Sequence, residues 1–165
     1  MGEPEVDDVG FDPKAELLEQ WNGHRNLTLW VARAFPPDKL CTYAPVGPLR
    51  TFGAMLDEIA RIEQAYMRGL AEDRWSYDPQ DPPAPADAAA AVAFVEEAHA
   101  YTRSVWDRLP ADMLLAPRKD PFFFGDAKRP YDWLVYCVEN EIHHRGQGYI
   151  YLRELGVEPP PFYVR

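Results

Sequence analysis

The residues best suited to chemistry lie in one segment near the C-terminus, residues 139–147, which read ENEIHHRGQ. At about 100° per helical residue, Glu141 falls within the apolar face of this segment, while Asn140 and His144 fall at the edge of that face. His143 points away from it. Two side chains four residues apart on a helix, such as Asn140 and His144, can bind the same ion. The pattern therefore predicts a groove that includes His144.

A second helical segment supplies carboxylates. Its apolar stripe runs from Phe52 to Leu70; Glu63 lies inside this stripe, Glu58 lies at its edge and Asp57 points outward. Edge residues on neighbouring helices flank a groove, and an imidazole facing a carboxylate can bind Zn²⁺ or a similar divalent ion.

The candidate metal ligands are therefore His144, Glu58 and Asn140. An oxygen-rich set of this kind favours harder ions such as Mn²⁺ more than a histidine-rich set does. The alternative is that His144 and Glu58 form only a structural hydrogen bond, and that Asn140 is a packing or capping amide.

Other polar residues could line the pocket or support these candidates. Glu63 and Glu141 lie on buried faces and need partners, because an unpaired buried charge is costly. We expect arginine or tyrosine partners and a structural role, such as orienting His144. Gln147 is a further candidate for the surroundings of the pocket, where it and Arg145 would tie helix ends together.

Three further residues have two interpretations each. His24 lies on the core-facing stripe of the first helical segment and is either a pocket residue or a satisfied core histidine. Cys137 precedes His144 by about two turns; a small core residue is favoured over a reactive thiol. His99 is interpreted as structural or as part of an interface.

Four amphipathic helices must position these residues. Proline and glycine separate them, and two long connections, 71–85 and 110–129, join the later ones. Phe122, Phe123 and Phe124 in the second connection need cover from a bundle end or a partner. No strand-type alternation of useful length occurs. The expected helices run from Asp12 to about Phe35, from near Thr51 to about Leu70, from about Asp87 to Leu109, and from Pro130 to Gly156.

Composition limits the class of protein. The 165 residues suit an acidic tail (1–11) and a single domain (12–165) with an extended, proline-rich C-terminal end. A net charge of -10 with no basic patch excludes a nucleic-acid surface. No apolar run approaches the roughly 18 residues of a membrane helix, and no signal peptide is expected. Two distant cysteines favour a reducing, cytoplasmic location.

Two segments carry a family resemblance. Residues 51–63 (TFGAMLDEIARIE) resemble the second helix of the DinB/YfiT-like proteins, and residues 141–147 (EIHHRGQ) followed by 151–156 (YLRELG) resemble their last helix. The resemblance covers residues 12 to 160. It implies an all-α four-helix bundle of the up-down-down-up type, with two long connections.

The resemblance also implies a metal site formed by one histidine of the second helix and an HxxxH pair of the last. Glu58 and Asn140 replace two of these histidines here, and only His144 is kept. Relatives imply a thiol-dependent S-transferase, or a related hydrolase or isomerase, that uses a divalent metal (Zn, Ni or Mn) and a low-molecular-weight thiol. They also imply a homodimer. The alternative is a non-catalytic small-ligand-binding or stress-response bundle that has lost the metal site.

Overall fold

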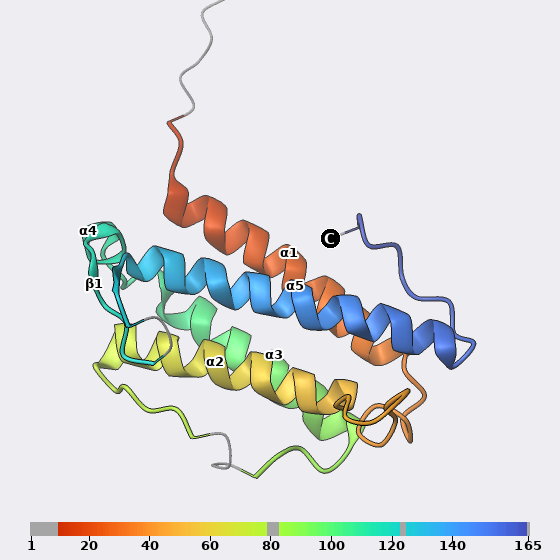
Figure 1. Ribbon diagram of the computed structural model, residues 1–165. Coiled ribbons are helices and arrows are strands. Elements are labelled where there is room, and N and C mark those ends of the chain that lie inside the picture. The colour runs from red at the N-terminus through yellow and green to blue at the C-terminus, as the bar shows by residue number, and fades with distance from the viewer. Residues whose placement is uncertain (1–9, 79–82, 123–124, 165) are drawn as a thin grey trace, which may run out of the picture.

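The chain forms a mostly helical structure (Figure 1). The computed structural model describes residues 10–78, 83–122 and 125–164. Four long helices and one short helix lie within these ranges, together with a pair of two-residue strands. In chain order the elements are α1 (Pro13–Ala34), α2 (Phe52–Glu72), α3 (Ala88–Trp106), α4 (Ala111–Leu115), β1 (Arg118–Lys119), β2 (Ala127–Lys128) and α5 (Pro130–Glu154).

The ends of the helices follow local chemistry. Asp12, Thr51 and Asp87 cap α1, α2 and α3, and the side chain of each accepts a backbone N–H from the first turn. Helix α2 ends at Glu72, and the following C-cap residue, Asp73, has a left-handed φ of 55°. Gly156, with a φ of 74°, follows the end of α5 and turns the chain away from it. These bounds agree with the predicted helices to within a few residues.

The connection between α3 and α5 differs from the prediction of one irregular loop. It contains α4, and β1 pairs with β2 in antiparallel register, Arg118 opposite Lys128 and Lys119 opposite Ala127. Elements this short carry no readable periodicity. Helix α3 also ends earlier than predicted, at Trp106, because the N–H groups of Arg108 and Leu109 form tight turns onto residues 105 and 106.

The core lies between the four long helices, with α2 packed against α3 and α5, and α1 packed against α5 and α3. Helices α2 and α5 approach closely at Gly148. A Cβ atom there would lie 2.7 Å from Cε2 of Phe52, whose ring stacks on Phe35 with centroids 5.0 Å apart. This close packing allows polar side chains of α2 and α5 to reach one another directly.

Part of the aromatic segment in the long connection is covered by the bundle itself. The ring of Phe122 packs against those of Tyr66, Trp75 and Tyr77, with centroids 5.3, 6.0 and 6.3 Å apart. Residues 123 and 124, and most of the predicted N-terminal tail, lie outside the described residues. Within the described ranges, no helix is both long and apolar enough to cross a membrane.

Candidate functional site

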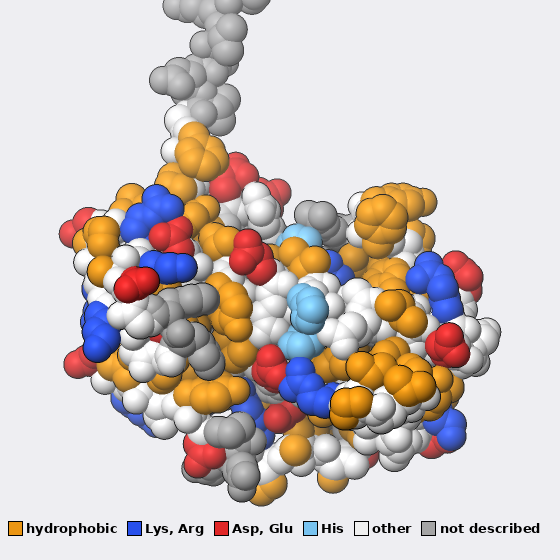
Figure 2. Space-filling view, in the orientation of Figure 1, with side chains coloured by type: hydrophobic (Ala, Val, Ile, Leu, Met, Phe, Trp, Pro, Cys, Tyr) orange, Lys and Arg blue, Asp and Glu red, His pale blue; other side chains and the backbone are white. Residues whose placement is uncertain are grey.

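Three side chains converge on the carboxylate of Glu58, at the seam between α2 and α5. Its Oε1 lies 3.0 Å from Nε2 of His144 and 3.4 Å from Nδ2 of Asn140. Its Oε2 accepts from Nη1 of Arg50, which precedes the N-cap of α2. Figure 2 shows histidine side chains in the middle of this face, with acidic and basic side chains beside them. The structure thus brings together all three predicted ligands, and adds an arginine.

These contacts determine the charge of Glu58. The hydrogen bond with His144 is the largest influence, and together with Arg50 it outweighs the effect of burial and lowers the pKa of Glu58 to about 2. Glu58 is therefore a carboxylate at neutral pH, and its three partners all act as hydrogen-bond donors to it.

Glu58 should make stability depend on acid. Its folded-state pKa lies below the ordinary value of 4.5, so its contribution is complete above pH 4.5 and is lost as the pH falls toward 2. Between pH 5.5 and 3, the wild type should lose about 1–2 kcal/mol more unfolding free energy than Glu58→Gln, after discounting for partial exposure. Urea unfolding at several pH values measures this. Glu96→Gln, which removes a surface ion pair with Arg33, should behave like the wild type; equal pH dependence of Glu58→Gln and wild type would contradict the assignment.

The imidazole of His144 is enclosed. The residue is 5% exposed, its Nε2 faces Glu58, and its Nδ1 is buried without a hydrogen-bond partner among the residues described. A metal-bound histidine usually donates its second N–H to a carboxylate or a carbonyl, which orients the ring. His144 lacks that support, and neither ring nitrogen is presented to a ligand in the groove.

The groove itself is a shallow hollow of about 370 Å³. Besides the residues around Glu58, its walls include Tyr136, Glu139 and His143 of α5. Burial, followed by the charge of Glu58, raises the pKa of Tyr136. Tyr136 is therefore a neutral phenol at pH 7, and the groove offers carboxylate groups, this phenol and the imidazole of His143 to a bound molecule.

The buried carboxylates Glu63 and Glu141 share one cation, Arg25. Its Nη2 lies 2.7 Å from Oε2 of Glu63 and 2.9 Å from Oε2 of Glu141, its Nε donates to Oε1 of Glu141 at 3.1 Å, and its Nη1 donates to the carbonyl of Val95 at 3.0 Å. Both carboxylates are fully buried. The expected arginine partner is present, but Glu141 binds α1 through Arg25 and does not orient His144.

Glu63 also organises α3. Its Oε1 lies 2.9 Å from Nδ1 of His99 and accepts from the Thr102 hydroxyl at 2.6 Å. Burial alone would raise the pKa of Glu63, but Arg25, His99 and Thr102 reverse this and lower it. Nε2 of His99 lies 2.8 Å from Oδ1 of Asn22. His99 is thus part of a buried polar network that joins three helices.

Of the other pocket candidates, His24 and Cys137 lie away from the groove, whereas Gln147 contacts His143 in its wall. Nδ1 of His24 is 3.0 Å from Nη2 of Arg145, inside the contact between α1 and α5. The thiol of Cys137 is buried in the core, and burial raises its pKa well above the ordinary value. Gln147 contacts His143 on the surface of α5, with Nε2 atoms 3.1 Å apart.

Sequence reasoning missed two arginines and misplaced one aspartate. Arg50 precedes the N-cap of α2, where helical periodicity gives no direction. The burial of Arg25 could have been predicted, because it follows Trp21 by one helical turn on the apolar stripe of α1. Asp57 was expected to point outward but is largely covered, because its Oδ2 accepts from Nε of Arg61 at 2.8 Å.

The geometry defines a helical protein with a histidine–carboxylate groove between its second and last long helices. The DinB family model matches residues 8–165, and the chain belongs to the DinB family. A DinB-like protein from Bacillus subtilis shares 21% identity at a TM-score of 0.72, covering 91% of this chain and 98% of its own. Another from Bacillus cereus shares 18% identity at a TM-score of 0.68, covering 90% and 97%. No curated protein matches the sequence.

Proposed function

We propose that the groove beside Glu58 is a metal-independent binding site for a small molecule that carries an amine. The observation that carries this proposal is the convergence of Arg50, Asn140 and His144 on the carboxylate of Glu58. The guanidinium of Arg50, itself an organic cation, pairs with this carboxylate, which supports the proposal that an amine can take its place.

The donor set departs from the three-histidine metal centre that the family resemblance implies. Within the described part of the chain, no group of three or more histidine, cysteine, aspartate or glutamate side chains could hold a metal ion. The third candidate, Asn140, offers a neutral amide in place of an imidazole. The buried Nδ1 of His144 also lacks the partner that would orient a metal-bound ring.

The lining of the groove favours a cationic ligand. Glu58 and Glu139 bring two carboxylates, and Tyr136 adds an aromatic wall. His144 cannot act as a general base in this arrangement, because Nε2 is turned to Glu58 and Nδ1 is buried. A binding role therefore suits the geometry better than acid–base catalysis.

A titration with butylamine tests the proposal, with butanol as the neutral control of the same length. In a ¹⁵N-labelled protein with a metal chelator present, the amine should shift the amide signals of Glu58, Glu139 and Asn140 in a saturable manner. Butanol should not. Glu139→Gln should weaken amine binding about three- to tenfold, because it removes one of two carboxylates from the groove.

Glu154→Gln is the matched control, since it removes an exposed carboxylate from the same helix outside the groove. It should bind butylamine as the wild type does. Shifts that are absent, or that butanol reproduces, would rule out the amine site.

A metal-assisted, thiol-dependent S-transferase is the second candidate. Oε1 of Glu58 lies 3.0 Å from Nε2 of His144 and 3.4 Å from Nδ2 of Asn140. Two neighbouring ligand atoms that each lie about 2.1 Å from one zinc ion are separated by about 3.0–3.4 Å, so the spacing here resembles that of a zinc site. Arg50 is half-exposed and could leave Glu58. A bound ion would supply a Lewis acid that holds a thiolate.

Metal content separates the two candidates. Protein purified without a histidine tag should contain no stoichiometric zinc, nickel or manganese, and adding these ions should leave the unfolding temperature unchanged. His144→Ala should not alter this result. Stoichiometric metal together with stabilisation by an ion, both lost in His144→Ala, would favour the transferase.

The helix order that the family resemblance implies, up-down-down-up, is also part of this proposal. The ribbon colours in Figure 1 support it, because α1 and α5 run one way while α2 and α3 run the other. Contacts between α2 and α5 agree: Glu58 meets His144, whereas the later Tyr66 stacks on the earlier Trp133. This antiparallel pairing brings the edge residues of the two helices together.

A further inference from the structure

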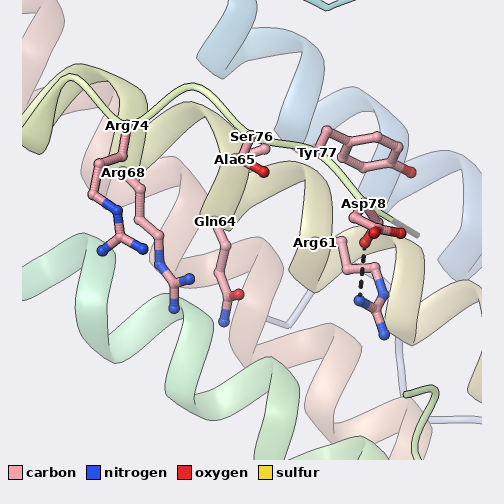
Figure 3. Close-up of a pocket in the computed structure, with 8 residues that line it drawn as sticks. All are labelled: Arg61, Gln64, Ala65, Arg68, Arg74, Ser76, Tyr77 and Asp78. Atoms are coloured by element: carbon pink, nitrogen blue, oxygen red, sulfur yellow. Dashed lines mark hydrogen bonds between the residues drawn. The ribbon is translucent and has the colours of Figure 1, made fainter. Parts of the chain in front are cut away.

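A second pocket, which we term the arginine pocket, lies along α2 from Arg61 to Arg68 and extends over the segment that follows the helix, so that its far end is ten residues beyond Glu58. The segment that follows α2 runs back beside the helix and leaves a hollow of about 170 Å³ (Figure 3). Three arginines take part in its walls, in a chain whose net charge is -10. The residues used below are Arg61, Gln64, Arg68, Arg74, Ser76 and Asp78.

Both ends of this returning segment are fixed. At the near end, the left-handed Asp73 donates its N–H to the carbonyls of residues 68 and 69. The ring of Trp75 then covers Gly69 so closely that a Cβ atom there would lie 2.2 Å from Trp75 Cε3. At the far end, Nη1 of Arg61 donates to the carbonyl of Asp78 at 3.2 Å. The returning segment is therefore fixed beside α2 by one backbone contact and two side-chain contacts.

The three guanidinium groups differ in how they are neutralised. Arg61 is buried and paired with Asp57 at 2.8 Å. Arg74 is exposed and paired with Glu72 at 3.1 Å. Arg68 forms no ion pair among the described residues; it faces the ring of Tyr101, 5.9 Å from its centroid, and its charge also acts on Glu72.

Two further donors in the pocket are unused within the described ranges, the amide of Gln64 and the hydroxyl of Ser76. In Figure 3 the guanidinium groups of Arg68 and Arg74 and the amide of Gln64 point to the same side. Asp78 lies at the other end, beside Arg61. One end of the pocket thus gathers two guanidinium groups and the unused amide of Gln64, with Glu72 paired to Arg74 there, while Asp78 lies at the other end.

We propose that this end of the arginine pocket binds a tetrahedral oxyanion, as inorganic phosphate or as the phosphate group of a small molecule. The forked guanidinium of Arg68 matches two phosphate oxygens and supplies the positive charge, while Arg74, paired with Glu72, and Gln64 add N–H donors. The hydroxyl of Tyr101 and the guanidinium of Arg74 both donate to the carboxylate of Glu72 and hold it in place beside the site.

The test is a titration of the full chain, followed by ¹⁵N NMR, with inorganic phosphate and with glycerol 3-phosphate. Sodium chloride at the same ionic strength is the reference. The amide signals of Gln64, Arg68 and Ser76 should shift in a saturable manner with both phosphates and not with chloride. Tighter binding of inorganic phosphate would indicate the free ion as ligand, and tighter binding of glycerol 3-phosphate would indicate the phosphate group of a small molecule. Arg68→Gln should weaken binding about tenfold, and Arg68→Lys should weaken it less.

Arg153→Gln is the matched control. Arg153 also faces a tyrosine ring, that of Tyr149 at 5.8 Å, but it lies on α5 outside the pocket. Its replacement should change phosphate binding less than about twofold. Because Arg68 and Arg153 are both exposed, the variants should unfold at wild-type temperatures. Phosphate effects that chloride reproduces, or equal weakening in Arg68→Gln and Arg153→Gln, would overturn the proposal.

Discussion

Replacing Arg25 with methionine is expected to lower the free energy of unfolding by about 3–5 kcal/mol, because Glu63 and Glu141 would remain buried without their shared cation. Methionine keeps much of the apolar length of arginine, so the loss reports mainly on charge. Urea unfolding at pH 7, followed by circular dichroism, measures it. Arg33→Met, on the same helix but with its side chain half-exposed, should cost no more than about 0.5 kcal/mol.

The pH dependence of this variant distinguishes a charge effect from a packing effect. Arg25 is the first of the groups that lower the pKa of Glu63, so without it burial should raise the folded-state pKa of Glu63 above its unfolded value. The folded state then binds protons more readily than the unfolded chain, so the deficit of Arg25→Met should shrink as the pH falls from 7 to 5. A deficit below about 1.5 kcal/mol that does not vary with pH would show that the network contributes little.

The sequence predicts which face of each helix is buried, but not which residues of the neighbouring helices that face contacts. Periodicity placed Glu63 and Glu141 on buried faces and separated buried His144 from exposed His143, as the structure has them. Helical spacing gives the direction of a side chain around its own axis. It does not give the position along their axes at which two helices contact each other. The pairing of Arg25 on α1 with carboxylates of both α2 and α5 therefore could not be predicted.

The candidate site shows the same limit. Glu58, Asn140 and His144 were predictable as neighbours, because edge positions on adjacent helices face one groove. Arg50 was not, since it lies outside every helix and its direction is set by the chain entering α2. The missed arginine changes the chemistry of the site, because it places a cation where the sequence alone suggested room for a metal ion.

Replacing Arg145 with methionine is the second change for which we expect a large loss, about 2–4 kcal/mol of unfolding free energy. The side chain is buried, and Nη1 donates to the carbonyl of His24 and to Oγ1 of Thr28, both at 3.1 Å. Nη2 meets Nδ1 of His24, which must be the acceptor because arginine only donates. The variant would remove this donor from three buried acceptors. Arg153→Met, two turns later and exposed, should cost less than about 0.5 kcal/mol.

Arg145 should also influence the groove, which a purely local role would not do. Neighbouring residues on a helix point about 100° apart, so His144 reaches α2 while Arg145 reaches α1. Together they fix the rotation of α5 about its axis. Arg145→Met removes the contacts with α1 that help to fix this rotation. The contact between His144 and Glu58 should therefore weaken. The acid-dependent stability assigned to Glu58 between pH 5.5 and 3 should then shrink in Arg145→Met but not in Arg153→Met. An unchanged pH profile would mean that α2 alone holds His144 in place.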